Sequence, residues 1–322
     1  MLIIARNVLL VVLLIMVLAV IIFTIKFYRD RNSVESEELL QVSKMTNIGS
    51  VKSLSILPLI ESETKGEHLT GEPGVSYLIK VDEKYILYDM GWNGSGQHPS
   101  PLLRNMDQLN VNVGQIDQIF ISHPHPDHTG GKGLKGSFAL SGQEIDLEGI
   151  SAYTSVEMEH PSAVVEDIDR PTRLDEGIVS TGPLSRAIWL LGIVQEQSLA
   201  INLEGKGIVL IVGCGHPSIE KIIKRAETIF DQPIYGVIGG LHYPITNPLN
   251  LQSIAQKVCG PKLPWQGYEK QEVKDAIQML KTKGIKVVGI SPHDSCDWTI
   301  SQFKENFGDG YQEILVGEEI VF

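Results

Sequence analysis

The first pattern along the chain is an almost unbroken apolar run over residues 8–25, which only Thr24 interrupts. A helix needs roughly 20 such residues to cross the hydrocarbon core of a bilayer. A secretory signal has a shorter apolar region followed by a small-residue cleavage site, and residues 21–26 contain no such site. The pattern therefore predicts a single-pass membrane anchor over residues 1–31, with a cleaved signal peptide as the alternative.

Basic residues flank this run unequally, because Arg6 precedes it whereas Lys26, Arg29 and Arg31 follow it. Flanking segments that are rich in lysine and arginine usually stay in the cytoplasm. The charges therefore favour a cytoplasmic position for the remainder of the chain, and the opposite orientation stays open. Residues 32–50 are largely polar and include several glutamates, so they are predicted to form a spacer.

Beyond the spacer, apolar and polar residues alternate in short runs separated by turn residues, a pattern typical of strands. Strands are predicted at residues 51–57, 75–80, 84–88, 116–121, 187–191, 198–203, 207–212, 234–238, 285–290, 314–316 and 319–322. Apolar positions three and four residues apart predict helices at residues 101–109, 217–230, 268–283 and 297–307. Residues 51–322 are therefore predicted to form one large domain of mixed strands and helices.

Candidate chemistry concentrates just after the apolar run 119–121, where His123, His125, Asp127 and His128 lie within six residues. Crowded imidazoles and a carboxylate at the end of a buried strand would repel one another or lack partners unless a cation lay between them. Neutral imidazole and carboxylate suit zinc, with manganese, nickel and iron as alternatives. The spacing therefore predicts a site for one or two divalent metal ions, and the alternative is a solvated polar loop.

Net charge and cysteine content narrow the function classes. The formal net charge is −12, whereas a sequence-independent nucleic-acid surface needs clustered lysine and arginine. We therefore expect no nucleic-acid partner. Cys214, Cys259 and Cys296 are an odd set without CxxC spacing, so reduced thiols are expected rather than a disulfide framework.

The strand at 116–121, the His-x-His-x-Asp-His motif and the turn Thr129-Gly130-Gly131 together resemble the metallo-β-lactamase superfamily. The resemblance extends over residues 51–322 and implies an α/β fold, an αββα sandwich that binds metal at one edge. It also implies that an aspartate after an earlier strand orients the site, and Asp89 fits this position.

The resemblance further implies the remaining metal ligands, because His216 and His293 each follow a β-branched run in the second half of the chain. It assigns one metal to His123, His125 and His216, and a second metal to Asp127, His128 and His293. Asp127 is also the candidate catalytic residue, since a carboxylate beside an activated water can orient it or shuttle its proton.

Three further residues are weaker candidates for the site. His160 lies between the first motif and His216, where it is either another ligand or a loop histidine. Cys214 is either a thiolate ligand or a small residue buried at a strand end. His242 resembles a motif histidine of one branch of the superfamily and is expected to contact substrate or support the ligands.

Within the superfamily, residues 72–79, 196–199, 213–217 and 239–242 are similar to the dihydropterin-methyl-ribofuranosyl-aminobenzene-phosphate synthase branch. Many bacterial members of that branch are described only as metal-dependent hydrolases. The chain departs from the branch at His293-Asp294-Ser295-Cys296, where the usual motif is His-Cys-Thr-Gly. This change touches the rim of the site, so we expect a different substrate choice.

The resemblance implies a metal-dependent hydrolase that uses a metal-activated water on an ester, phosphoester or amide of a small-molecule substrate. Two alternatives remain, a pterin-type synthase of the same fold and a non-catalytic ligand-binding domain. Metal content, measured together with turnover of several ester classes, distinguishes the three.

Overall fold

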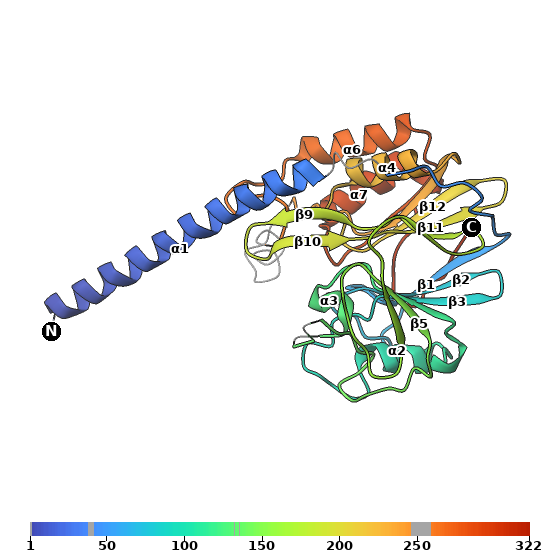
Figure 1. Cartoon of the computed structure of the whole chain (residues 1–322), viewed down its shortest axis with the longest axis horizontal. Coiled ribbons are helices and arrows are strands. Elements are labelled where there is room, and N and C mark those ends of the chain that lie inside the picture. Colours follow the sequence, from blue (N-terminus) through green and yellow to red (C-terminus); the bar gives the residue numbers. More distant parts are fainter. Residues whose placement is uncertain (1, 38–41, 132, 135, 246–258) are drawn as a thin grey trace.

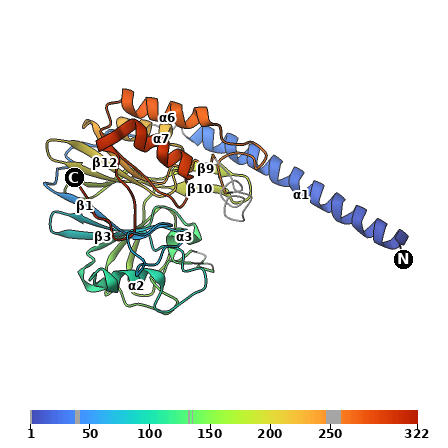
Figure 2. The same cartoon turned by 180° about the vertical axis from the view of Figure 1, so that it is seen from behind.

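The computed structural model describes residues 2–37, 42–131, 133–134, 136–245 and 259–322. Two β-sheets pack face to face, and helices cover the outer face of each sheet (Figure 1). A long N-terminal helix extends away from this sandwich, as the view from behind also shows (Figure 2). The αββα sandwich predicted from the sequence is therefore confirmed.

The first sheet has seven strands in the order β15-β1-β2-β3-β4-β5-β6. Their bounds are β1 Leu54–Ile60, β2 Ser76–Val81, β3 Lys84–Tyr88, β4 Gln118–Phe120, β5 Ser151–Thr154, β6 Val164–Asp167 and β15 Ile320–Val321. Helix α2 (Pro101–Gln108) packs on the outer face and begins where the Ser100 hydroxyl accepts a hydrogen bond from the Leu103 N–H. Strands β3 to β6 are parallel, so their carboxyl ends lie at one edge of the sheet.

The second sheet has six strands in the order β14-β13-β12-β11-β8-β7. Their bounds are β7 Thr172–Asp175, β8 Ile178–Ser180, β11 Leu199–Leu203, β12 Gly207–Val212, β13 Ile234–Gly239 and β14 Val287–Ile290. Three helices bury their apolar sides against it: α4 (Ile219–Ile229), α6 (Lys270–Thr282) and α7 (Asp297–Phe307). Because β12, β13 and β14 are parallel, the loops that follow them also meet at one edge.

The core between the sheets is formed by alternate residues of the facing strands. Tyr88 stacks on Tyr77 and Phe120, with ring centroids 6.0 and 5.4 Å away, and Ile201 and Ile211 face them from the second sheet. All five side chains are fully buried. Each such burial stabilises the fold by roughly 1.5–3 kcal/mol, so this layer fixes the two sheets, and with them the loops at their edge.

Helix α1 (Leu2–Glu37) exposes apolar side chains from Ile4 to Ile25 and is long and apolar enough to cross a membrane. Its carboxyl-terminal part packs against a hairpin of β9 (Leu184–Ile188) and β10 (Gly192–Glu196). Phe27 and Val34, seven residues apart on one helical face, are each only 2% exposed. The segment predicted as a spacer therefore begins as helix, because this face is buried; residues 38–41 lie outside the described residues.

Several predicted strand boundaries differ from the observed ones. The strand predicted at 51–57 begins at Leu54, and the strand predicted at 187–191 ends at Ile188, so that residues 189–191 form a turn. Residues 314–316 form no strand, and Val316 contributes only an isolated bridge to Thr64. Strands β5 to β8 and β10 were not predicted, and β5 to β8 have only three or four residues each, too few to show a period of two.

Candidate metal centre

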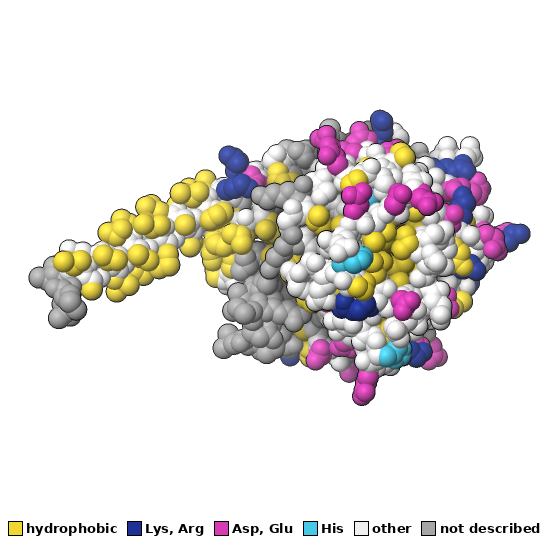
Figure 3. Space-filling view, turned by 90° about the horizontal axis from the view of Figure 1, so that it is seen from below, with side chains coloured by type: hydrophobic (Ala, Val, Ile, Leu, Met, Phe, Trp, Pro, Cys, Tyr) yellow, Lys and Arg dark blue, Asp and Glu magenta, His cyan; other side chains and the backbone are white. Residues whose placement is uncertain are grey.

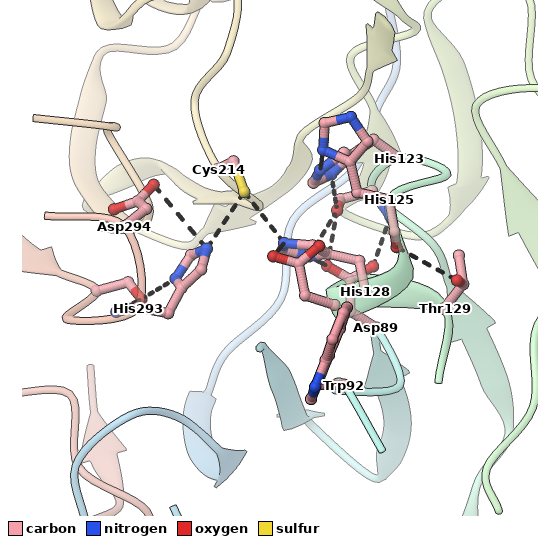
Figure 4. A network of polar contacts seen from close by, with 12 residues as sticks. Asp89, Trp92, His123, His125, His128, Thr129, Cys214, His293 and Asp294 are labelled. Carbon is pink, nitrogen blue, oxygen red and sulfur yellow. Dashed lines mark hydrogen bonds and ion pairs between the residues drawn. The ribbon is translucent and has the colours of Figure 1, made fainter. Parts of the chain in front are cut away.

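Loops from both sheets converge at the edge where the parallel strands end (Figure 4). His123 follows β4, and the short helix α3 (Pro126–Thr129) carries Asp127 and His128. Cys214 and His216 follow β12, and His293 follows β14. Helix α3 begins at a proline, which suits a first helical position, and ends at Gly130, whose φ is +93°. A Cβ atom at that position would collide with the Ala139 carbonyl, so the turn requires glycine.

The first group of donors contains three histidines. His125 Nδ1 lies 3.0 Å from His123 Nε2 and 3.1 Å from His216 Nε2. The three donor atoms all lie within 4.8 Å of one another. The structure therefore brings together the three residues that the resemblance assigns to one metal.

The second group of donors contains Asp127, His128, Cys214 and His293. Cys214 Sγ lies 3.1 Å from His128 Nε2 and 3.2 Å from His293 Nε2, and His128 Nε2 lies 3.8 Å from Asp127 Oδ2. Asp127, His128 and His293 were expected together. The structure adds the Cys214 sulfur, for which the sequence had left a thiolate ligand and a small buried residue as alternatives.

The chemistry of these donors fits a metal ion. Burial and the neighbouring imidazoles hold the pKa of His123, His216 and His293 well below the ordinary range, and burial lowers the pKa of His125 to about 4. Each close contact between two ring nitrogens needs a proton on one of them, and neutral imidazoles that face one another do not have enough protons for every such contact. A cation accepts all of these lone pairs at once. The His125 Nε2 and His216 Nδ1 atoms point away from the group and are buried without a hydrogen-bond partner. If each neutral ring carries its proton there, the facing atoms His125 Nδ1 and His216 Nε2 are unprotonated and can bind a metal.

Two donors must lose a proton before they bind a metal. Burial, with Asp127 nearby, raises the pKa of the Cys214 thiol well above its ordinary value. Burial opposes a charge on His128, but Asp89 and Asp127 outweigh it and raise the pKa of His128 to about 9. Metal binding at this group therefore competes with protons at both residues.

Asp89 orients two of the histidines. Its Oδ2 lies 2.6 Å from His128 Nδ1 and accepts a 2.6 Å hydrogen bond from the Ser122 hydroxyl, while its Oδ1 accepts from the Ser122 N–H at 2.7 Å. Ser122 Oγ in turn lies 2.9 Å from His123 Nδ1. Both imidazoles are thereby held with Nε2 toward the donor groups, which is the supporting position expected for Asp89.

Glu61 has the corresponding place beside His293. The Ser291 hydroxyl contacts both Glu61 Oε1 and His293 Nδ1, and Tyr77 donates a 2.6 Å hydrogen bond to Glu61. Burial raises the pKa of Glu61 to about 7. Two carboxylate and serine pairs thus position ligand histidines. Asp89 and Ser122 position His123, and Glu61 and Ser291 position His293.

A third carboxylate, Glu196 at the end of β10, holds the turn after β12. Its Oε1 accepts hydrogen bonds from the Cys214 N–H at 3.1 Å and the Gly215 N–H at 2.8 Å. Its Oε2 accepts from the His216 N–H at 2.9 Å. Because Cys214 belongs to one donor group and His216 to the other, this single side chain positions a ligand of each group.

Both groups line a cavity of about 460 Å³. Its wall includes the largely apolar side chains of Pro73, Trp92, Leu191 and Cys259. The Asp127 side chain is 28% exposed, unlike that of His128, so its carboxylate is accessible to a molecule in the cavity. His242 also lines the cavity, with its ring centroid 5.1 Å from that of His216.

Other candidate histidines lie away from these groups. The His160 ring stacks on Phe138 with centroids 4.9 Å apart, and its Nδ1 accepts from two backbone N–H groups. The structure thus gives His160 no place in either group. It lines a larger hollow of about 720 Å³ that contains no member of either group. His68 and His98 are exposed loop residues outside both groups.

Sequence reasoning missed the supporting residues Ser122, Ser291, Glu61 and Glu196. The two serines had a local signal, because each lies within two residues of a ligand histidine and next to a strand end. The two glutamates had none, since their partners are distant in the sequence. Glu61 directly follows the apolar strand β1, and Glu196 lies within residues 196–199 of the resemblance, but neither fact points to the contacts that these side chains make.

Comparisons with known proteins agree with this geometry. The family model of the metallo-beta-lactamase superfamily matches residues 69–134. The 7,8-dihydropterin-6-methyl-4-(beta-D-ribofuranosyl)-aminobenzene-5'-phosphate synthase of Methanocaldococcus jannaschii is 26% identical over 324 residues, which cover 86% of this chain and 100% of the relative.

Two crystal structures share the fold. Tm1679, described as a metal-dependent hydrolase of the beta-lactamase superfamily, matches with a TM-score of 0.55 at 19% identity, over 83% of this chain and 98% of that chain. The metallo-beta-lactamase fold protein YhfI from Bacillus subtilis matches with a TM-score of 0.50 at 12% identity, over 84% of this chain and 100% of that chain. The chain therefore has the metallo-β-lactamase fold, and its sequence is similar to that of the Methanocaldococcus jannaschii synthase.

Proposed function

We propose that this protein is a membrane-anchored, zinc-dependent hydrolase of a small-molecule ester, phosphoester or amide. The observation that supports this most strongly is the convergence of two donor groups at one cavity. His123, His125 and His216 form one group, and Asp127, His128, Cys214 and His293 form the other. Imidazole, carboxylate and thiolate together suit zinc better than harder ions, and manganese, nickel and iron remain alternatives.

When bound at these groups, metal ions would polarise the scissile carbonyl or phosphoryl group and lower the pKa of water from about 15.7 to about 7. The protein's own contribution is to position and move the proton. Asp127 is partly exposed in the cavity, so its carboxylate can accept a proton from the attacking water and return it to the leaving oxygen or nitrogen. The bond from the carbonyl carbon or phosphorus to the leaving atom breaks as the bond to the water oxygen forms.

A substrate screen on the full-length protein tests this proposal. The metal-loaded protein in detergent is assayed against acyl esters, lactones, thioesters, phosphodiesters and amides, with metal content measured on the same samples. We expect turnover in at least one class and its loss after chelation, with recovery on adding zinc. Asp127→Asn should reduce turnover about 100-fold or more. Folded wild-type protein that binds metal but turns over no class would contradict the hydrolase and favour a ligand-binding domain.

A synthase of the pterin type is the second candidate, because the similarity to the Methanocaldococcus jannaschii protein covers 86% of this chain. The test is to supply the substrates of that synthase and to assay its named product by mass spectrometry. Formation of the product by wild-type protein, and its absence with His123→Ala, would favour the synthase over the hydrolase.

The membrane anchor is supported by how helix α1 joins the domain. Apolar side chains from Ile4 to Ile25 are exposed, whereas Phe27 is buried in a cluster with Ala187 and Leu263. Cleavage of the helix as a signal peptide would uncover that cluster. We therefore expect the protein to stay in the membrane fraction through washes at high salt. A mature chain that starts near Arg31 would contradict the anchor.

The cytoplasmic orientation rests on Lys26, Arg29 and Arg31, which follow the apolar run, against Arg6 before it. Protease added to intact cells tests this orientation. A catalytic domain that survives until the cells are lysed supports it, and digestion in intact cells reverses it.

A further inference from the structure

The exposed apolar residues of the domain are concentrated at one place. Among the described residues outside α1, the large hydrophobic side chains that are exposed are Val164, Leu190, Leu191, Ile193, Trp265 and Val321. Four of them, Leu190, Leu191, Ile193 and Trp265, belong to the tip of the β9–β10 hairpin or to the segment that packs on it through Trp189. We call these four residues the hairpin patch. A clustered apolar surface of this kind marks an interaction site.

The hairpin patch is continuous with the apolar part of α1. The Trp189 ring lies 5.6 Å from the Phe23 ring and 5.9 Å from the Trp265 ring, and Trp189 Nε1 donates a 3.2 Å hydrogen bond to Thr24 Oγ1. Figure 1 shows the hairpin alongside the helix, and the space-filling view shows apolar side chains passing from the helix onto the domain (Figure 3).

The order of contacts along α1 gives the direction of the hairpin. Ala187 clusters with Phe27, whereas Trp189 reaches Phe23 and Thr24, which lie within the apolar run. The chain therefore approaches the membrane end of α1 as it enters the turn that holds Leu190 and Leu191. Tryptophan is enriched at the level of the lipid headgroups, just where an apolar span ends. If α1 crosses a bilayer, this turn lies at the membrane surface.

The same patch reaches the active-site cavity through one residue. Leu191 is 46% exposed on the patch and also lines the cavity of about 460 Å³ beside His216 and His293. The cavity volume is in the range of ordinary ligand pockets, about 300–1,000 Å³. Its described lining contains no lysine or arginine, the residues that usually hold phosphates and other anions. A substrate of low charge with an apolar part suits this lining.

We propose that the hairpin patch contacts the lipid bilayer beside α1 and that the cavity receives an amphiphilic carboxylic ester from that bilayer. This inference rests on the proposed hydrolase function and on the membrane anchor. The reaction would break the bond between the acyl carbon and the ester oxygen and form one to the water oxygen. One water proton reaches the leaving alcohol, and the product acid releases the other. The acyl chain stays near Leu191 and the membrane.

Quenching of tryptophan fluorescence tests the membrane contact without any need for activity. The full-length protein is reconstituted into phosphatidylcholine vesicles whose acyl chains carry bromine, which quenches indole emission at short range. We expect Trp265→Phe to lose a large part of the quenched signal. Trp298→Phe is the matched control, because Trp298 lies on α7 under Lys270 and should leave quenching unchanged. Equal quenching in wild type and Trp265→Phe would overturn the membrane contact.

Chain-length preference tests the substrate. Zinc-loaded protein in unbrominated vesicles is given p-nitrophenyl acetate and p-nitrophenyl dodecanoate. We expect kcat/KM to be at least about tenfold higher for the dodecanoyl ester, since each buried methylene adds favourable transfer free energy. Leu190→Asn should lower the dodecanoyl rate at least about fivefold and leave the acetyl rate within about twofold. Val164→Asn, which alters an exposed apolar residue on β6, should change neither rate.

The outcomes separate this inference from the proposed function. Hydrolysis of both esters without chain-length preference, or with no effect of Leu190→Asn, keeps the hydrolase and overturns delivery from the bilayer. No turnover of either ester contradicts the ester substrate, and turnover of another class in the broader screen then decides whether the hydrolase stands. In that case Trp265 quenching still supports or overturns the membrane contact by itself.

Discussion

Replacing Glu196 with glutamine should weaken metal binding at both donor groups although Glu196 belongs to neither. The two carboxylate oxygens accept three backbone hydrogen bonds, from Cys214, Gly215 and His216, at 2.8 to 3.1 Å. Glu196 is only 2% exposed, so water cannot replace a lost acceptor. Glutamine keeps the length of the side chain but has a single acceptor oxygen. At best it retains the bonds to Cys214 and Gly215 and turns its amide N–H toward the His216 N–H.

The free-energy loss expected for Glu196→Gln follows from the number of hydrogen bonds that change. A buried N–H that loses its acceptor costs about 1–3 kcal/mol, and bonds to a neutral amide are roughly half as strong as bonds to a carboxylate. The total loss is therefore about 2–4 kcal/mol. If the turn shifts to relieve the facing N–H groups, Cys214 and His216 move with it, and metal affinity falls about 10–100-fold. If the turn does not shift, the loss appears in folding stability alone.

Competition with a chromophoric chelator measures zinc affinity on the full-length protein, and denaturant unfolding at saturating zinc measures stability. Glu204→Gln is the matched control, because Glu204 is exposed in the turn between β11 and β12. A folded Glu196→Gln protein whose zinc affinity stays within about twofold of wild type would refute the positioning role. Loss of affinity at only one of two sites would refute the idea that this carboxylate serves both.

Three further changes have expected outcomes. His293→Ala should lose metal, measured by elemental analysis, and turnover, whereas His68→Ala in an exposed loop should keep both; full metal and activity in His293→Ala would exclude it as a ligand. Asp89→Asn should lower zinc affinity about 10–100-fold in the chelator assay, because the amide has one acceptor oxygen and cannot serve both the Ser122 N–H, now at Oδ1, and the contacts with the Ser122 hydroxyl and His128, now at Oδ2. Removing residues 2–37 should leave metal per chain unchanged but uncover the apolar side of the β9–β10 hairpin, which increased binding of a hydrophobic dye would show.

The sequence predicted the fold because its strongest signals are local. The strand before His123, the turn at Gly130 and each histidine that directly follows a strand are signals that each span only a few residues. The parallel order of β12, β13 and β14 then brings Cys214, His216 and His293 to the same edge without further information. The sequence alone is therefore enough to predict that the candidate ligands lie at the ends of strands.

The supporting carboxylates were not predictable in the same way. Glu61 meets Ser291 across 230 residues, and Glu196 meets the turn after β12 from the end of an unpredicted strand. Such pairings depend on how two sheets pack, and a single sequence carries no signal for them. The turn at residues 189–191 was missed for a related reason. Residues 187–191 form an uninterrupted apolar run like that of a buried strand, and the packing of the hairpin against helix α1 leaves no signal in the sequence.

Several acidic side chains are buried around the two donor groups, and their ionisation has a cost in folding free energy. Burial raises the pKa of Asp89, Asp294 and the Cys214 thiol, and raises those of Glu61 and Glu196 to about 7. An ionised group in such a place costs several kcal/mol unless an opposite charge compensates it. Of the histidines in the two groups, only His128 has a raised pKa, so the imidazoles supply little positive charge. Divalent cations held by those same histidines would supply it. The acids that orient the ligands therefore also couple metal binding to folding stability, because they are least costly when the donors hold a cation.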